Sequence, residues 1–225
     1  MDCEPAPPAR DCVVLLHGLA RSARSMRKLE ACLAAQGYMV DNLSYPSRRH
    51  GIAALADMAV GGALARCRAR SPRQIHFVTH SLGGVLVRHH LARHRVERLG
   101  RVVMLAPPNQ GSEVVARFGR LPGFRFINGP AGAELGTRAD SVPLRLGAVD
   151  YPVGVIAGTR SINPLLSTAL PSPNDGKVSV ERTRVEGMSD FLCVPVSHPF
   201  IMRNDAVIEA VLRFLASGAF APGQA

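Results

Sequence analysis

Hydrophobic and polar positions follow two rhythms along this chain. Apolar runs of four to six residues alternate with longer segments of helical spacing. The expected strands are 13–16, 39–43, 75–79, 102–106, 153–157 and 191–196, and the expected helices are 25–36, 51–70, 82–95 and 205–216. Short β-branched runs between amphipathic helices are typical of a mainly parallel sheet covered on both faces. The pattern predicts an α/β fold that binds ligands at the carboxyl ends of its strands.

The residues at the ends of the first expected helix agree with this assignment. Ser25 is a suitable N-cap, because its hydroxyl can accept a hydrogen bond from an early helical N–H. Gly37 stands where a glycine commonly follows the last helical residue. We therefore expect a helix that ends sharply before the strand 39–43.

One segment, residues 107–152, breaks the rhythm. It holds proline, glycine and apolar residues with weak periodicity, and a connection of this length usually forms a flap or a substrate-binding wall. Its candidate substrate contacts are Phe118, Leu121, Phe124, Phe126 and Ile127. For each aromatic taken singly, a small core under a loop is an equally good interpretation.

Composition narrows the class of protein. The chain has 225 residues, of which 47% are hydrophobic and 20% charged, without a fibrous or solenoid repeat. Such a chain can bury a large core, which excludes a mainly disordered protein. We expect one domain over residues 1–225 with a flexible N-terminus at 1–11.

The basic charge does not indicate a nucleic-acid partner. The formal net charge is +10, but the arginines are spread through the chain. Neither interleaved aromatic residues nor a nucleic-acid motif accompanies them. A solvated surface is therefore the favoured interpretation of the charge.

The lack of a visible targeting signal and the pattern of cysteines favour a cytoplasmic protein. The apolar-looking stretch 52–65 is interrupted by Asp57 and is too short to span a membrane. The first residues lack the features of a secretory signal, so the chain is either intracellular or numbered after removal of a leader. The cysteines are five, widely spaced and without a CxxC pair, which argues against a zinc site and a disulfide framework.

The strand 75–79 leads into His80-Ser81-Leu82-Gly83-Gly84, and a helix follows at once. A strand, a sharp turn and a helix around a serine form the context of a nucleophile elbow, which requires small neighbours. Gly83 meets this requirement, whereas Thr79 replaces the first glycine of G-x-S-x-G and crowds the turn. Ser81 is the candidate nucleophile; the alternative is an ordinary serine near a helix N-cap.

A serine nucleophile needs a base and an acid, which follow it in the chain in the order acid, then histidine. His198 is the only histidine well downstream, and it follows the last expected strand. Asp175 is the favoured acid, although Asp-Gly is also a common turn signal. Three other acidic residues stay open for this role: Asp150, Glu181 and Asp190.

An oxyanion hole needs two N–H donors, normally one after the nucleophile and one from the loop after the first core strand. Leu82 and Leu19 occupy these positions, and Gly18 lets the backbone turn an amide toward the site. Backbone donors tolerate any side chain, so the leucines are equally suited to an apolar wall.

Two other groups of residues are candidates for a site. His90 and His94 lie four residues apart on the expected helix 82–95, but no H-E-x-x-H pattern accompanies them and arginines surround them, so a solvated helix face is favoured over a metal. The paired glycines 61–62 and 83–84 lack the lysine and spacing of a phosphate loop. We expect neither a metal nor a cofactor.

Five segments together resemble the α/β-hydrolase superfamily, in particular small bacterial lipases and esterases. They are His17-Gly18-Leu19, the 80–84 turn, the segment 105–112, Asn174-Asp175-Gly176 and Ser197-His198. The resemblance covers residues 13–215 and implies a triad of Ser81, Asp175 and His198, with Leu19 and Leu82 as the oxyanion hole. It also implies a three-layer fold with a trimmed sheet of about six strands and no large cap domain.

Three functions are compatible with these residues. The leading hypothesis is a serine esterase or lipase that cleaves short- to medium-chain acyl esters, small-molecule or lipid-like, through an acyl-enzyme on Ser81. A thioesterase or acyltransferase would use the same triad. A non-catalytic binding protein of hydrolase fold would lack a triad member, and none is evidently missing.

Overall fold

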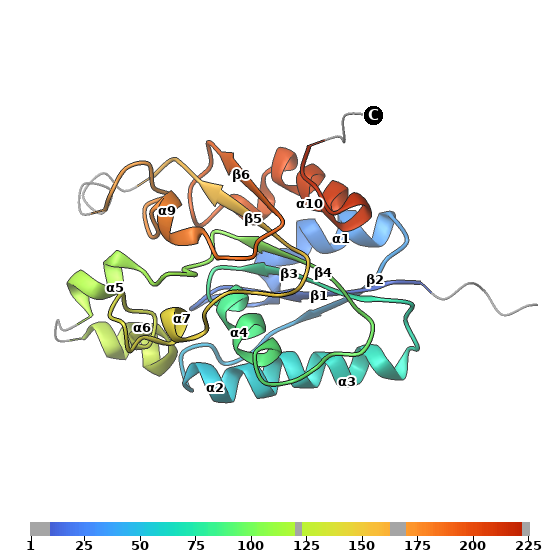
Figure 1. Cartoon of the computed structure of the whole chain (residues 1–225), viewed down its shortest axis with the longest axis horizontal. Coiled ribbons are helices and arrows are strands. Elements are labelled where there is room, and N and C mark those ends of the chain that lie inside the picture. Colours follow the sequence, from blue (N-terminus) through green and yellow to red (C-terminus); the bar gives the residue numbers. More distant parts are fainter. Residues whose placement is uncertain (1–9, 120–122, 163–169, 222–225) are drawn as a thin grey trace, which may run out of the picture.

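The sheet of this protein is parallel throughout. The computed structural model describes residues 10–119, 123–162 and 170–221 and contains a six-stranded sheet of order β2-β1-β3-β4-β5-β6 (Figure 1). The strands are β1 (Cys12–Leu16), β2 (Met39–Leu43), β3 (Ile75–His80), β4 (Leu99–Leu105), β5 (Val153–Gly158) and β6 (Asp190–Val194). The predicted strands and the six-stranded α/β fold are confirmed.

Helices cover both faces of the sheet, as Figure 1 shows. One face carries η1 (Ala23–Met26), α1 (Arg27–Ala35), η3 (Ile201–Arg203) and α10 (Asp205–Ser217); the other carries α2 (Ile52–Leu55), η2 (Ala56–Gly61), α3 (Gly62–Ala69) and α4 (Leu82–Leu91). Successive side chains of a strand point to opposite faces. Accordingly Val13 and Leu15 of β1 join the core under α1 and α10, whereas Val14 and Leu16 join the core under α4.

The start of the first helix differs from the prediction. Ser25 is no N-cap: it lies buried inside η1, a 3₁₀ turn that begins two residues earlier, and its Oγ donates to the Ser22 carbonyl oxygen at 2.8 Å. A serine hydroxyl can bond backward within its own turn as well as forward, so the residue type did not fix the boundary. Gly37 has the expected left-handed backbone, with φ of 85°.

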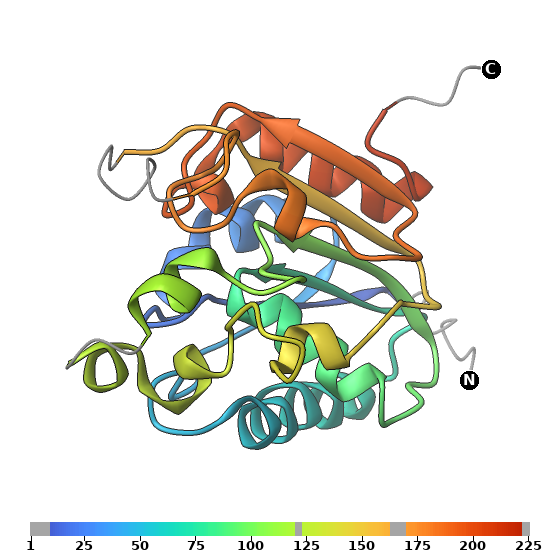
Figure 2. The same ribbon diagram turned by 60° about the vertical axis from the view of Figure 1, so that its left-hand side comes forward.

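The long connection 107–152 contains short helices that its weak periodicity did not reveal. They are α5 (Glu113–Phe118), α6 (Phe124–Ala133) and α7 (Val142–Arg145), and both views place them together at one end of the sheet (Figures 1 and 2). A fourth short helix, α9 (Val180–Thr183), follows β5.

Buried Arg88 of α4 ties the two ends of this connection together. It donates to the carbonyl oxygens of Asn109 at 2.8 Å and of Gly147 at 2.6 Å. A guanidinium offers five N–H donors in a planar fork, so one side chain can satisfy both carbonyl groups.

The cysteines require a correction. Cys12 of β1 and Cys67 of α3 are joined by a disulfide, with their Cα atoms 6.3 Å apart, whereas Cys32 and Cys193 are free thiols. The expectation of a chain without disulfides is therefore wrong at this pair. The two residues are 55 positions apart in the sequence, and only the packing of α3 on β1 brings them together, so their spacing carried no signal.

The predicted flexible N-terminus is partly described. Residues 1–9 lie outside the described ranges, but Asp11 is held by Arg73, whose Nη2 lies 2.7 Å from its carboxylate. Asp11 is thus fixed in place, and the flexibility of residues 1–9 stays a prediction. Among the described residues, no helix has the length and apolarity that crossing a membrane requires.

Candidate active site

Ser81 occupies the turn between β3 and α4. Its backbone has φ of 52° and ψ of −117°, and the residue is only 9% exposed. A non-glycine residue with positive φ is strained and persists only where the surrounding structure holds it, as at functional sites. Here the Ser81 N–H donates to the Leu105 carbonyl oxygen of β4 at 2.9 Å. The turn thus has the conformation of a nucleophile elbow.

Two glycines make this turn possible. A Cβ on Gly83 would lie 2.7 Å from the Leu16 carbonyl oxygen, so β1 and α4 approach closely only because the side chain is absent. A Cβ on Gly84 would lie 3.2 Å from Thr79 Oγ1. Gly84 therefore relieves the crowding expected from Thr79. Gly84 lies one position beyond the G-x-S-x-G pattern, which is why the pattern predicted crowding.

The structure brings Asp175 and His198 into contact. The distance from His198 Nδ1 to Asp175 Oδ2 is 2.6 Å, and both residues are almost fully buried. The other carboxylate oxygen, Oδ1, accepts the N–H groups of Lys177 and Val178 at 2.9 and 2.8 Å. A Cβ on Gly158 would lie 2.9 Å from Asp175 Cβ, so this glycine makes room for the acid. Asp175 thus forms the Asp-Gly turn through Oδ1 and contacts His198 through Oδ2, so the two interpretations of this residue are compatible.

The alternative acids are engaged elsewhere. Asp190 accepts hydrogen bonds from the N–H groups of Phe191 and Phe220. Glu181 is exposed beside Arg184, and Asp150 is exposed. Of the four candidates, Asp175 alone contacts His198 within the described residues.

Ser81 and His198 line one cavity of about 100 Å³, although no hydrogen bond between these two described side chains is formed. Such bonds are often longer before a substrate binds. Because Nδ1 of His198 is held by Asp175, Nε2 is the ring nitrogen left for Ser81.

His80, next to the serine, is a contact that the sequence did not reveal. Its Nε2 lies 3.1 Å from the His198 carbonyl oxygen, which can only accept, so Nε2 carries the proton. Burial, followed by the charges of His198 and Arg21, holds the pKa of His80 well below its usual value. The neutral ring therefore positions the backbone of His198.

The loop after β1 is fixed by its own hydrogen bonds. The Ala20 N–H donates to Ser47 Oγ at 3.0 Å and the Arg21 N–H to the Gly18 carbonyl oxygen at 3.3 Å. The Leu82 N–H belongs to the first turn of α4, whose amides have no partner inside the helix. The arrangement leaves the Leu19 and Leu82 N–H groups for a ligand, and their oxyanion role stays a prediction.

Tyr45 was also missed by the sequence interpretation. It stacks on His17 with the ring centroids 4.0 Å apart, its hydroxyl donates to the His17 carbonyl oxygen, and its N–H donates to His17 Nε2 at 3.2 Å. His17 is the histidine of the His-Gly segment, so this stack supports the loop that carries Leu19.

The cavity around Ser81 and His198, called here the Ser81 cavity, has an apolar wall. Its lining includes Leu19, Pro108, Val114, Val115, Leu135, Val178 and Pro199. Val114 and Val115 belong to α5 and were not singled out from the sequence, because a two-turn helix shows too little periodicity.

The predicted substrate contacts lie differently. Phe118 is half-buried at the end of α5, Phe126 is 92% exposed and lines a neighbouring hollow, and Ile127 is 61% exposed. None of these three lines the Ser81 cavity. Leu121 and the side chain of Phe124 lie outside the described residues. Substrate contact by the five residues stays a prediction.

Comparison with known proteins assigns the family. The sequence model of the alpha/beta hydrolase family matches residues 13–218. The chain belongs to the alpha/beta hydrolase family. This confirms the resemblance that the elbow and the His-Gly segment indicated. Comparison with curated protein sequences gave no match.

Solved structures of this hydrolase fold include three with names that bear on function. A lipase of Bacillus licheniformis in its mature form has a TM-score of 0.77 at 18% identity, covering 94% of each chain. A phospholipase of Legionella pneumophila has 0.69 at 18% identity, over 93% of this chain and 61% of its own. A metagenomic carboxyl esterase has 0.62 at 20% identity, over 88% and 68%. At these identities the likeness shows the fold.

Proposed function

We propose that this hydrolase cleaves carboxylic esters through an acyl-enzyme on Ser81. The observation that carries the proposal is the 2.6 Å contact between buried Asp175 and His198 in the cavity of Ser81. An acid that orients a histidine beside a serine at a strained elbow is the arrangement that activates a hydroxyl nucleophile.

In the proposed reaction Ser81 Oγ attacks the acyl carbonyl carbon while His198 Nε2 accepts the hydroxyl proton. Asp175 keeps the proton of the imidazole on Nδ1 and stabilises the imidazolium that forms. The N–H groups of Leu19 and Leu82 donate to the oxyanion. His198 gives its proton to the leaving alcohol. Water then attacks the acyl-enzyme with His198 again as the base, and the proton passes from His198 to Ser81 Oγ as the carboxylic acid leaves.

The size and the wall of the Ser81 cavity support the proposal that the acyl groups are short to medium in length. Its volume is about 100 Å³ and its wall is largely apolar. Each buried methylene contributes about 0.8 kcal/mol, which is a factor of about four in kcat/KM. A small cavity fills after few carbons, so we expect an optimum in chain length. The names of the three structural neighbours, a lipase, a phospholipase and a carboxyl esterase, support an ester substrate.

A panel of p-nitrophenyl esters from acetyl to palmitoyl tests this function. We expect turnover to rise through the short chains and to fall for the long ones, with mass spectrometry placing a phosphonate probe on Ser81. Inert esters together with an unlabelled serine would overturn the proposal. Turnover of palmitate with negligible turnover of butyrate would overturn the preferred chain length.

A further inference from the structure

Two larger hollows adjoin the Ser81 cavity. The first, called the Tyr45 hollow, has about 450 Å³ and is lined by Ala20, Arg21, Tyr45, Pro46, Ser47, Arg48, Arg49 and Phe126. The second, called the Ser22 hollow, has about 470 Å³ and is lined by Leu19, Ala20, Arg21, Ser22, Arg24, Ser25, Lys177 and Arg203. Arg21 lines both hollows and the Ser81 cavity. A ligand at Ser81 thus lies beside Arg21.

All charged side chains lining these three spaces, histidine aside, are cations. They are Arg21, Arg24, Arg48, Arg49, Lys177 and Arg203. Within the described residues no aspartate or glutamate lines the three spaces, and none of the six cations forms an ion pair. The walls of the three spaces therefore carry positive charge, and the nearby carboxylate of Asp175 does not line them.

The positive charges of neighbouring side chains also disfavour the charged forms of Arg21 and Lys177. Burial, and then the charge of Arg203, lowers the pKa of Arg21. Burial, and then the charge of Arg21, lowers the pKa of Lys177, which Asp175 only partly offsets. An anion placed between Arg21 and Lys177 would relieve this repulsion and gain charge-assisted hydrogen bonds.

We propose that the preferred substrate is an ester that carries a carboxylate or phosphate group close to the scissile bond, held by Arg21 and Lys177. The proposal rests on the ester hydrolysis proposed above and names the substrate class. Electrostatic focusing in a cleft of one sign raises the association rate of an oppositely charged ligand by about 10–10³ and falls with ionic strength.

Matched chromogenic esters test the charge alone. 3-Carboxy-4-nitrophenyl butyrate is compared with 4-nitrophenyl butyrate, and 4-nitrophenyl hydrogen adipate with 4-nitrophenyl hexanoate, so that the anion stands on the alcohol or on the acyl side. We expect kcat/KM for at least one anionic ester to exceed that of its neutral partner about tenfold at low salt. The ratio should fall in 0.5 M salt and in Arg21→Gln and Lys177→Gln.

Arg95→Gln is the control, because it removes the same charge from an exposed position that lines none of the three spaces. It should keep the anionic preference of the wild type. Ratios at or below one for both pairs, or equal ratios in Arg21→Gln and Arg95→Gln, would refute the anionic substrate while leaving ester hydrolysis intact. Failure to cleave all four esters would instead refute the hydrolytic function.

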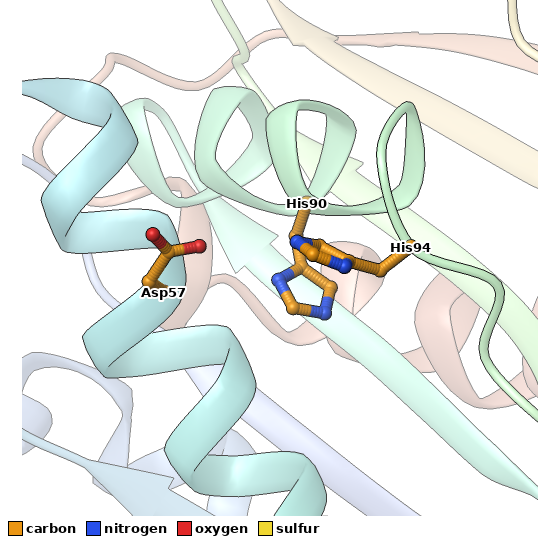
Figure 3. Close-up of side chains that lie close together, drawn as sticks. All are labelled: Asp57, His90 and His94. Carbon is orange, nitrogen blue, oxygen red and sulfur yellow. The ribbon is translucent and has the colours of Figure 1, made fainter.

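A second inference concerns the other end of α4. Asp57 of η2 and the histidines His90 and His94 present ligand atoms that all lie within 4.8 Å of one another. Figure 3 shows the two imidazoles side by side, with the Asp57 carboxylate facing them from the neighbouring helix. His94 follows the end of α4, where its N–H donates to the His90 carbonyl oxygen at 2.9 Å and its ring centroid lies 4.6 Å from that of His90. The third ligand, Asp57, comes from 33 positions before His90, so the sequence pattern did not reveal it.

His90 is the anchor of this group. It is 8% exposed, and its Nδ1 has no hydrogen-bond partner among the described residues. A buried nitrogen without a partner is costly unless something outside the described contacts satisfies it.

We infer that Asp57, His90 and His94 bind a zinc ion. Tetrahedral Zn²⁺ with bonds of about 2.0–2.1 Å places its ligand atoms about 3.3 Å apart, which is closer than the 4.8 Å limit of the cluster. Asp57 and His94 are exposed, so their side chains can close on the anchored His90. Two imidazoles, one carboxylate and a water complete four-coordinate zinc, and the ion would link η2 to α4.

Thermal unfolding of the untagged chain in Zn²⁺ and in Mg²⁺ tests the site. At a hundredfold excess over Kd, an ion that binds only the folded state should raise Tm by about 5–10 °C. We expect this rise with Zn²⁺ and not with Mg²⁺, and we expect Asp57→Asn and His94→Ala to abolish it. Both substitutions are at exposed positions, so the metal-free Tm should change little.

Two controls separate this site from other metal-binding groups. His50→Ala removes an exposed histidine elsewhere, and Cys193→Ser removes the exposed thiol; both should keep the zinc-dependent rise. Equal shifts in all variants, or no shift in the wild type, would refute the site. Zinc content after dialysis should be one ion per chain in the wild type and none in Asp57→Asn.

Discussion

The two ends of helix α4 place functional groups in opposite ways. At the first end the strained backbone of Ser81 is held by the close approach of Gly83 to β1 and by the hydrogen bond that the Ser81 N–H donates to β4. At the last end His90 is buried, but His94 and Asp57 reach the same point as exposed, adjustable side chains. A reacting hydroxyl must be placed within fractions of an ångström, whereas a metal ion can draw flexible ligands together. Rigidity is concentrated where the proposed chemistry needs it.

The largest effect should come from removing the nucleophile at the first end. Ser81→Ala should lower ester turnover by about 10⁴–10⁶, because the acyl-enzyme cannot form, while circular dichroism and Tm stay near those of the wild type. Ser71→Ala is the matched control, since Ser71 also has positive φ but lies far from the cavity in an exposed turn. A fully active Ser81→Ala protein would contradict the mechanism.

Asp175→Asn should have the next largest effect. The amide can still accept from the Lys177 and Val178 N–H groups, but it stabilises the wrong tautomer of His198, which costs about 10⁴ in kcat. Steady-state kinetics with the best ester of the panel gives the value. If Asp175→Asn retained nearly full activity while Asp190→Asn lost it, the acid would be Asp190.

Glycine substitutions compare the two ends by stability. Gly83→Ala should cost about 1–3 kcal/mol, because its Cβ would meet the Leu16 carbonyl oxygen at 2.7 Å. Gly61→Ala, beside His90, should stabilise by about 0.4–1 kcal/mol, since its nearest contact would be His90 Cε1 at 3.8 Å. Urea denaturation measures both. If both substitutions changed the free energy of unfolding in the same direction, the contrast between the two ends of α4 would be lost.

The smallest expected effect is at the last end without metal. His94→Ala removes an exposed side chain and should change the free energy of unfolding by less than about 0.5 kcal/mol in the presence of a chelator. The same denaturation experiment measures it. A loss above 1 kcal/mol would show that His94 stabilises the fold independently of zinc.

Local pattern was enough to predict the sheet and to name Ser81, His198 and Leu19, which line the Ser81 cavity. The strands are continuous apolar runs, and the elbow combines strand, small residues and helix within ten positions, so both signals lie in adjacent residues. Asp175 and His198 were found by their order after Ser81. Their contact is confirmed by the 2.6 Å distance, whereas their catalytic roles stay predictions.

The features that sequence did not predict depend on distant partners. Cys12 meets Cys67 only through packing, and Asp57 meets His90 only because η2 lies against α4. Thr79 departs from the glycine of the elbow pattern, and nothing in the sequence indicated that its side chain would find room. In the folded chain Gly84 provides that room. In each case the contact between the two residues forms only in the folded chain.

The buried side chain of Arg88 fixes both ends of the segment between Asn109 and Gly147 to α4 with one guanidinium. Ala131 and Leu135 of this segment belong to the core that α4 also contacts, so a replacement segment has to keep both the two junctions and these core positions. Since this stretch supplies Val114, Val115 and Leu135 to the cavity, grafting foreign segments between the same junctions offers a route to hydrolases with new acyl preferences on an unchanged catalytic base.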